Sequence, residues 1–273
     1  MKPTLPLDVL LHIIGLLAAT AEYHTSSIRS LQILSQTCKF MVPLCCKHLF
    51  SFLSLTSDSS LRRFGALLSK NPDIACYVRS LIYTVQNPSS VHELNILYLI
   101  RERSSLIRSI KLSSERSLNW NSFPESIRLS LVSLIQLPTV TDFDITNFKG
   151  FPATAFSSCS NLIHLRLGKL YLDPSEVNQV ISRSKIPTPV SLCIRSGISG
   201  LIALLNSASL HAVRPIVDFS RLQKADFTVE SRGDIRMVYT LIMATRWLEY
   251  IGIRSEWTDV IAYHSKFFDR GYL

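Results

Sequence analysis

The sequence predicts an α/β (α+β) protein in which a short helical N-terminal domain precedes a longer region of alternating strands and helices. Two observations lead to this prediction. The first fifty residues place apolar side chains at helical spacing. From residue 78 onward, one short apolar frame recurs at intervals of roughly 30 residues, with helical segments between its copies. We expect a helical domain at 1–55, a linker helix within 56–77 and a strand–helix region at 78–273.

The first predicted helix follows Pro6, a residue that helix entries tolerate. Its residues Leu10, Ile13, Ile14 and Leu17 share one face, and Val9, Leu11 and Leu16 make the other side apolar too. A helix that is apolar nearly all round needs cover from more than one direction. We therefore expect part of it to pack within its own domain and part to meet a partner. Two further short helices are predicted at 30–40 and at 43–50.

With these helices in place, the N-terminus resembles an F-box. That motif opens on a Leu-Pro pair before an apolar helix, continues with a Leu-x-x-x-Cys type second helix, and closes on His-Leu-Phe, here residues 48–50. The resemblance implies that the helices dock on Skp1, the adaptor of a cullin-RING ubiquitin ligase. It implies the Skp1-binding residues Leu5, Pro6, Val9, Leu10, Ile13, Ile14, Leu34 and Cys38. Two features depart from the motif: a predicted loop of about a dozen residues, Ala18 to Arg29, and a third helix without tryptophan, with Phe40 nearest in place.

Two other interpretations of the N-terminus remain open. Lys2 before an apolar run, with Ala19-Thr20-Ala21 after it, imitates a secretory signal and its cleavage site. Pro6, Asp8 and His12 interrupt that run. The segment could also be an ordinary amphipathic core helix at the start of a helical domain.

The recurring frame is an apolar residue followed by x-x-apolar-x-apolar, the strand pattern of leucine-rich repeats. Its copies are Val78/Leu81/Tyr83, Ile107/Ile110/Leu112, Val140/Phe143/Ile145, Leu162/Leu165/Leu167, Leu222/Ala225/Phe227 and Leu248/Ile251/Ile253, with a degenerate copy at Val190/Leu192/Ile194. Helices are predicted between them at 91–103, from Phe123-Pro124-Glu125 through Ile135, from Asp173-Pro174-Ser175-Glu176, and at 198–208, 234–246 and 256–270. Another, at 60–70, joins the N-terminal helices to the first strand.

Short connections between strands and helices favour parallel strands, each crossing back through a helix. Stacked units of this kind bury a common core and form an open solenoid with a curved parallel sheet. A closed α/β sheet with the same alternation is the alternative. This region also resembles the repeat regions of F-box proteins from mushroom-forming fungi, through Arg62-Arg63-Phe64, Asn71-Pro72-Asp73 and Tyr77-Val78-Arg79-Ser80-Leu81.

Side chains between the buried positions of each strand are expected on the concave face of the sheet. These predicted target-binding residues are Lys111, Asp142, Asp144, His164, Arg166, Lys224, Asp226, Tyr250 and Arg254, with Ser109 beside them. Their charge changes sign from strand to strand, which suits a polar protein segment better than a polyanion. Asp142 and Asp144 share a face and could instead bind a cation or a base.

Composition narrows the class of protein. No run approaches the roughly 20 apolar residues of a membrane span, so we expect a soluble protein. The six cysteines have no metal-ligand spacing, which favours the reducing side of the membrane, in the cytoplasm, the nucleus or both. The net charge is +9, but the basic residues occur singly or in pairs and not in a cluster. We therefore do not expect a nucleic-acid partner.

The predicted function is that of a non-catalytic substrate-recognition subunit, since the sequence has no zinc-hydrolase pattern, Cys-x-x-Cys pair, nucleophile elbow or phosphate loop. No cofactor and no metal are predicted. The partners implied by the resemblance are a Skp1-like adaptor with its cullin-RING ligase, and an unknown protein substrate. The alternatives are a leucine-rich interaction scaffold unrelated to ubiquitin, in which the first helices only cap the solenoid, and an uncharacterised hydrolase.

Overall fold

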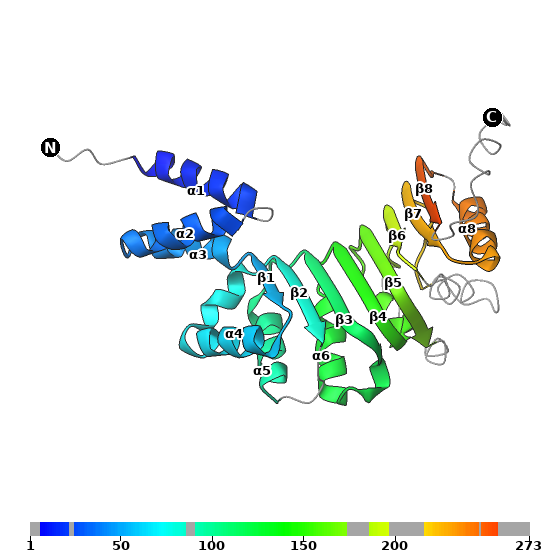
Figure 1. The fold of residues 1–273 in the computed structure, drawn as a ribbon, viewed down its shortest axis with the longest axis horizontal. Coiled ribbons are helices and arrows are strands. Elements are labelled where there is room, and N and C mark those ends of the chain that lie inside the picture. The colour runs from blue at the N-terminus through cyan, green and yellow to red at the C-terminus, as the bar shows by residue number, and fades with distance from the viewer. Residues whose placement is uncertain are drawn as a thin grey trace. The chain divides into compact units, whose positions relative to one another are not determined.

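The computed structural model describes residues 6–21, 25–85, 91–173, 186–196, 216–245 and 247–255 (Figure 1). It shows N-terminal helices followed by an eight-stranded parallel sheet, with strands in chain order and helices interleaved. The chain divides into two compact units: the first contains residues 1–115 and 122–140, and the second contains residues 116–121 and 141–273.

Three helices open the first unit: α1 (Leu7–Ala21), α2 (Thr25–Thr37) and α3 (Met41–Leu49). They pack around a small core of Ile14, Leu31, Met41 and Cys45. The predicted loop of a dozen residues between the first two helices is wrong, because only residues 22–24 separate α1 from α2. Neither glycine nor proline occurs between Leu16 and Thr37, and Ala18 and Ala19 have high helix propensity, so helix continues on both sides.

The first strand, β1 (Phe52–Leu55), was not among the predicted strands. It belongs to the same frame, since Phe50, Leu53 and Leu55 repeat the apolar-x-x-apolar-x-apolar pattern. The two later positions pair in register with Leu81 and Tyr83. The repeat array therefore begins directly after α3, earlier than the pattern from residue 78 had predicted.

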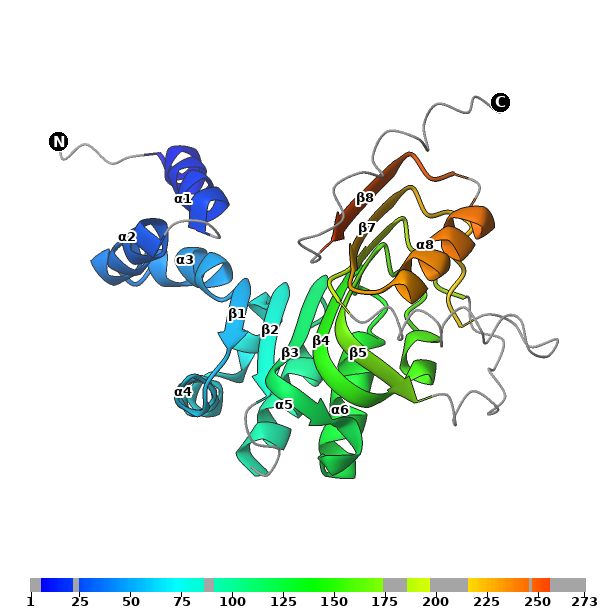
Figure 2. The ribbon, with the colours of Figure 1, turned by 45° about the vertical axis from the view of Figure 1, so that its right-hand side comes forward.

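The remaining elements of the first unit follow in strand–helix alternation. They are α4 (Asp58–Lys70), the 3-10 helix η1 (Pro72–Tyr77), β2 (Ser80–Val85), α5 (Val91–Arg103), β3 (Ser109–Asn119), η2 (Trp120–Ser122) and α6 (Glu125–Ile135). Residues 116–121, which end β3 and begin η2, belong to the second unit. In Figures 1 and 2, α4, α5 and α6 lie along one side of β1–β3. Alternate side chains of β2 are buried on that side, namely Leu81, Tyr83 and Val85, as a sheet covered on one face requires.

The second unit contains β4 (Asp142–Pro152), η3 (Ala153–Phe156), β5 (His164–Asp173), β6 (Ser191–Ile194), β7 (Lys224–Val229), α8 (Arg232–Ala244) and β8 (Tyr250–Ser255). Its core holds a cluster of aromatic rings. Trp120 meets Phe151 edge to face at a centroid distance of 4.7 Å, and Phe151 in turn lies 5.7 Å from Phe156. The predicted helices at 198–208 and 256–270, and the one opening at Asp173-Pro174, lie outside the described residues.

The predicted frames give both the strands and their register. Leu81 pairs with Ile110 in the first unit, and in the second Phe143 pairs with Leu165 and Leu165 with Leu192. The degenerate frame forms β6, which pairs with β7 through Leu192 and Ala225. The prediction of parallel strands is confirmed for every pair whose register is given.

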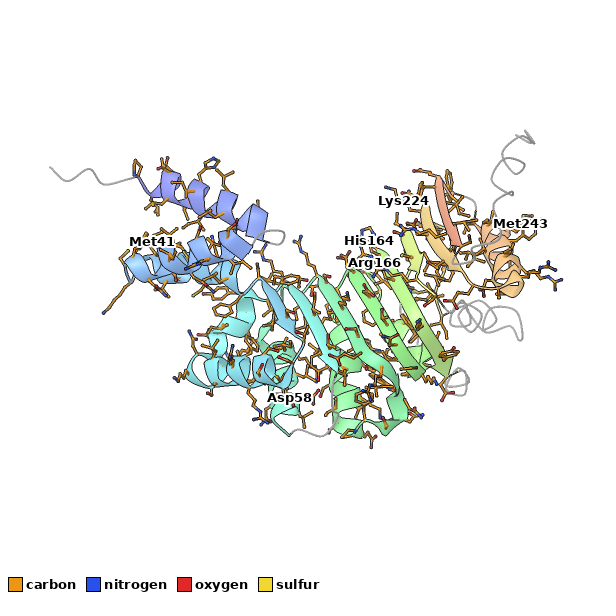
Figure 3. The ribbon with its side chains drawn as sticks, viewed as in Figure 1. Met41, Asp58, His164, Arg166, Lys224 and Met243 are labelled. Atoms are coloured by element: carbon orange, nitrogen blue, oxygen red, sulfur yellow. The ribbon has the colours of Figure 1, made fainter. Side chains whose placement is uncertain are left out.

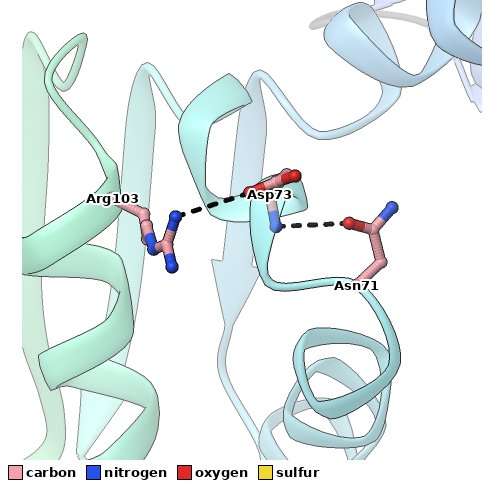
Figure 4. A network of polar contacts seen from close by, with 3 residues as sticks. All are labelled: Asn71, Asp73 and Arg103. Carbon is pink, nitrogen blue, oxygen red and sulfur yellow. Dashed lines mark hydrogen bonds and ion pairs between the residues drawn. The ribbon is translucent and has the colours of Figure 1, made fainter.

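The turn between α4 and η1 is fixed by a short polar network (Figure 4). The side-chain oxygen of Asn71 accepts from the backbone N–H of Asp73 at 3.2 Å, which caps η1. The carboxylate of Asp73 lies 3.6 Å from the guanidinium of Arg103, at the end of α5. Both charged side chains are largely exposed, so the cap orders the turn more than the ion pair does.

None of the helices in the described parts of the chain is both long and apolar enough to cross a membrane.

Candidate functional site

Helix α1 is the first candidate surface, because its apolar residues are divided between the inside and the outside of the helical domain. Leu10, Ile14 and Leu17 recur at i, i+4 and i+7, and all three pack on the core formed with α2 and α3. The remaining apolar residues of the helix stay exposed. They are Leu7, Val9, Leu11, Ile13 and Leu16, with exposed fractions between 38 and 58%.

The predicted Skp1-binding residues therefore fall into three groups. Pro6, Val9, Ile13 and Cys38 are exposed, and Leu10 and Leu34 are half-buried against the helical core. Ile14 has no exposed surface at all, so its side chain serves the core of the domain and offers nothing to a partner in this structure. Leu5 lies outside the described residues.

The exposed apolar surface also includes residues that were not predicted as docking residues. On α1 these are Leu7, Leu11 and Leu16. Others are Ile33 on α2, Val42 on α3 and Phe40 immediately before α3. The periodicity of α1 did carry the signal for Leu11 and Leu16, since both were recognised as apolar residues of the opposite side. A contiguous apolar patch on a monomer commonly marks an interaction site.

The second candidate surface is the polar face of the second unit. Parallel pairing brings two rows of side chains together across β4–β8. One row is Asp142, His164, Ser191, Lys224 and Tyr250, and the next is Asp144, Arg166, Cys193, Asp226 and Gly252. Figure 3 labels His164 and Arg166 on β5 and Lys224 on β7, and β6 lies between these two strands. The predicted residues of this unit are thus brought together, whereas Lys111 belongs to the first unit, where it pairs with Ile82.

Exposure differs along these two rows. Arg166, Lys224 and Tyr250 are exposed, whereas Asp142, His164 and Asp226 are half-buried. Arg254 is exposed too, but it belongs to neither row, because it pairs with Thr228. Asp144 is the exception to the prediction of an accessible face, since only 6% of it is exposed. Its carboxylate accepts a hydrogen bond from the hydroxyl of Thr146 at 3.3 Å, and packing between neighbouring strands removes it from water.

The basic residues of this face are not neutralised by neighbouring acids. No ion pair within 4 Å joins Arg166, Lys224 or Arg254 to a carboxylate in the part of the chain that the structure describes. The Asp226 carboxylate occupies the space in which a side chain at Gly252 would begin, and the Tyr250 hydroxyl lies beside the same glycine. Within the described residues, the face therefore presents cations that have no carboxylate partner, which suits contacts to a polar chain.

Among the residues described, no cluster of three or more His, Cys, Asp or Glu side chains could hold a metal ion. The Asp142 carboxylate accepts from the Thr141 hydroxyl at 2.7 Å, and that of Asp144 from Thr146, so each aspartate has a local partner. Two titratable groups are strongly perturbed elsewhere. Burial raises the pKa of Cys159 to about 12, and burial with the nearby charge of Asp58 raises the pKa of Glu93 to about 7.

A groove of about 930 Å³ lies between α4 and α5, lined by residues that include Leu61, Gly65, Ile96 and Tyr98. The helices approach closely at Gly65, where a side chain would begin 2.9 Å from the Cδ1 atom of Ile96. No sequence pattern had indicated this groove.

No known protein-family model matches this sequence, and the search of curated proteins also found no match.

Proposed function

We propose that this protein is the substrate-recognition subunit of a Skp1–cullin–F-box ubiquitin ligase. In this proposal the exposed apolar residues of α1 bind a Skp1-type adaptor, and the polar face of the second unit binds the target protein. The repeats form a leucine-rich-repeat-like solenoid in this proposal. The parallel strands and the interleaved helices are consistent with such a solenoid. The F-box resemblance of the first fifty residues supplies the identity of the adaptor.

The observation that carries the proposal is the exposure of apolar side chains along α1. Five leucine, isoleucine and valine side chains on one fifteen-residue helix remain at least 38% exposed while three others fill the core. Fully burying such a side chain is worth about 1.5–3 kcal/mol, and covering the exposed part of one that is already half buried gains roughly half of that. A partner that covers several of them gains enough to hold the chain.

The mechanism requires no chemistry from this chain. A subunit bound to the adaptor at one end and to a target at the other raises the effective concentration of target lysines near the loaded ubiquitin carrier. The chain contributes binding and distance, and the catalytic step belongs to the other subunits.

The test is co-elution of the purified chain with a purified Skp1-type adaptor. A Val9→Ser/Ile13→Ser/Leu16→Ser variant, which leaves the core residues intact, should no longer co-elute. A matched triple variant at exposed apolar sites on other elements, Leu129→Ser/Tyr239→Ser/Met243→Ser, should behave as the wild type. Co-elution that survives the α1 variant would contradict the assignment of the docking helix.

A leucine-rich scaffold unrelated to ubiquitin is the second candidate. The observation in its favour is that α1–α3 share a core and thus could cap the first repeat. In that case the chain would not bind the adaptor, and the α1 variant would lose thermal stability without losing any partner.

A further inference from the structure

A small basic pocket lies in the first unit, between the end of α3 and the residues that precede β1 and β2. Its volume is about 240 Å³, and its lining residues are Lys47, His48, Ser51, Arg79 and Ser80. Three of the five carry basic side chains, two carry hydroxyls, and none is acidic.

Backbone hydrogen bonds hold the walls of this pocket together. The N–H groups of Arg79 and Ser80 both donate to the carbonyl of Ser51 at 2.9 Å. The hydroxyl of Ser51 donates to the carbonyl of His48 at 2.7 Å. The end of the helix and the start of the second strand are thus fixed to the same residue, Ser51, and Lys47, His48 and Arg79 line one pocket beside it.

The surroundings of His48 in this pocket disfavour a positive charge on its ring. Burial lowers the pKa of His48, and the charges of Lys47 and Arg79 lower it further. Neither Lys47 nor Arg79 forms an ion pair with a carboxylate among the described residues. Lys47 and His48 also lie in the last turn of α3, where cations complement the helix dipole. That explanation does not extend to Arg79, which comes from another element.

We propose that this pocket binds one compact oxyanion of the phosphate class, such as the phosphoryl group of a phosphate monoester. Lys47 and Arg79 supply the charge, and His48 donates a hydrogen bond in its protonated form. The hydroxyl of Ser80, which has no hydrogen bond to another described residue, is a further donor. This inference concerns a different surface from α1 and does not depend on the proposed function.

Proton linkage gives the pocket a measurable signature. A bound dianion favours the imidazolium form of His48, so binding raises its pKa, and affinity increases as pH falls through the range where the imidazole is protonated. A phosphate monoester itself takes up a proton near pH ~6. Sulfate keeps its two charges over this range, and it is therefore the probe for pH dependence.

The experiment is a sulfate titration of the full chain at constant ionic strength, followed through the His48 ring signals in NMR spectra, with His48→Gln as the assignment variant. We expect saturable shifts, a raised pKa for His48 in the bound state and tighter binding at lower pH. The His48→Gln variant should bind without that pH dependence. Shifts that do not saturate, or that chloride reproduces, would overturn the proposal.

A charge-matched pair of variants tests the location. Lys47→Gln/Arg79→Gln should weaken sulfate binding about tenfold or more, because each cation contributes a charge-assisted hydrogen bond. Arg63→Gln/Lys70→Gln removes the same charge from exposed sites on α4 and should leave binding unchanged. Equal losses in the two variants would show general attraction to a basic protein and contradict the assigned pocket. Circular dichroism of all variants establishes that each is folded.

Competition identifies the source of the phosphoryl group. Inorganic phosphate and a phosphoserine peptide should both displace sulfate from the wild type, and neither should do so in Lys47→Gln/Arg79→Gln. A peptide that competes more strongly than phosphate assigns the pocket to a phosphorylated protein segment, and equal competition assigns it to a free anion. The unphosphorylated peptide should not compete; if it does, the phosphoryl group is not what the pocket recognises.

Discussion

Two neighbouring isoleucines on α1 have opposite surroundings. Ile14 is completely buried against α2 and α3, whereas 40% of Ile13 is exposed. We expect Ile14→Ala to lower the free energy of unfolding by about 2–5 kcal/mol, the usual cost of truncating a buried isoleucine. Ile13→Ala should change it by less than about 1 kcal/mol. Urea denaturation of both variants measures the difference, and equal losses would contradict the division of α1 into a core side and a free side.

Glu93 gives a pH dependence whose sign follows from its environment. Burial, and then the charge of Asp58, raises its pKa from 4.5 to about 7. Between these values the folded chain holds a proton that the unfolded chain has lost, so the contribution of Glu93 to stability falls as pH rises from 4.5 to about 7 and is constant above that. We expect Glu93→Gln to be more stable than the wild type above pH ~7, by about 2–3 kcal/mol.

The measurement for Glu93 is urea denaturation of both proteins at several pH values. The difference between them isolates Glu93 from other groups, including His48, whose lowered pKa acts in the opposite direction as pH falls. Asp58→Asn is the control, since removing that charge should reduce the slope without abolishing it. A difference that does not vary with pH would show that Glu93 is ionised at neutral pH in the folded state.

At the scale of the element, α4 has a complete capping box at its first turn. The Ser57 hydroxyl accepts from the N–H of Ser60 at 3.2 Å, and the Ser60 hydroxyl accepts from the N–H of Ser57 at 3.1 Å. Ser57→Ala should destabilise the chain by about 1 kcal/mol. Ser69→Ala, at an exposed site in the last turn of the same helix, should be nearly neutral. Thermal denaturation compares the two variants, and equal midpoints would contradict a stabilising role for the Ser57 cap.

The elements that the sequence predicts best are the strands that carry the repeated apolar frame. The repeated apolar frame predicted β2–β8 and the register within the pairs β2–β3, β4–β5, β5–β6, β6–β7 and β7–β8, because residues with period two on a covered sheet leave little freedom in pairing. It also describes β1, but Phe50, Leu53 and Leu55 follow the helical N-terminus directly and were assigned to it. Residues 18–29 were expected to be a loop that departs from the F-box motif, but α1 and α2 extend into this segment because its helix propensity is high.

The candidate site could be predicted only in part, for a related reason. Spacing shows which residues share a helix face, but not which face the rest of the domain covers. Ile13 and Ile14 are equivalent in the sequence pattern, and only packing against Leu31 and Met41 distinguishes them. The basic pocket joins Lys47 and His48 to Arg79 through a backbone contact between two elements, which no short motif records.

At the scale of the whole molecule, the proposal assigns two functions to separate surfaces, so each should be lost independently. Arg166→Glu/Lys224→Glu reverses two exposed charges on the polar face of the second unit. We expect this variant to retain the adaptor and to lose the target, as judged by affinity purification and mass spectrometry against the wild type. The Val9→Ser/Ile13→Ser/Leu16→Ser variant should show the reverse. Joint loss of adaptor and target in the charge-reversal variant would contradict this separation.

The measurement that tests the central claim most directly is calorimetric titration of a Skp1-type adaptor into the wild type, Ile13→Ser and His12→Gln. Ile13 and His12 are adjacent exposed residues on α1, but only Ile13 offers apolar surface. We predict about tenfold or greater loss of affinity for Ile13→Ser, from the apolar area that it no longer buries, and no more than a small change for His12→Gln. Equal affinities for all three proteins, or no binding by the wild type, would contradict the assignment of α1 as the docking helix.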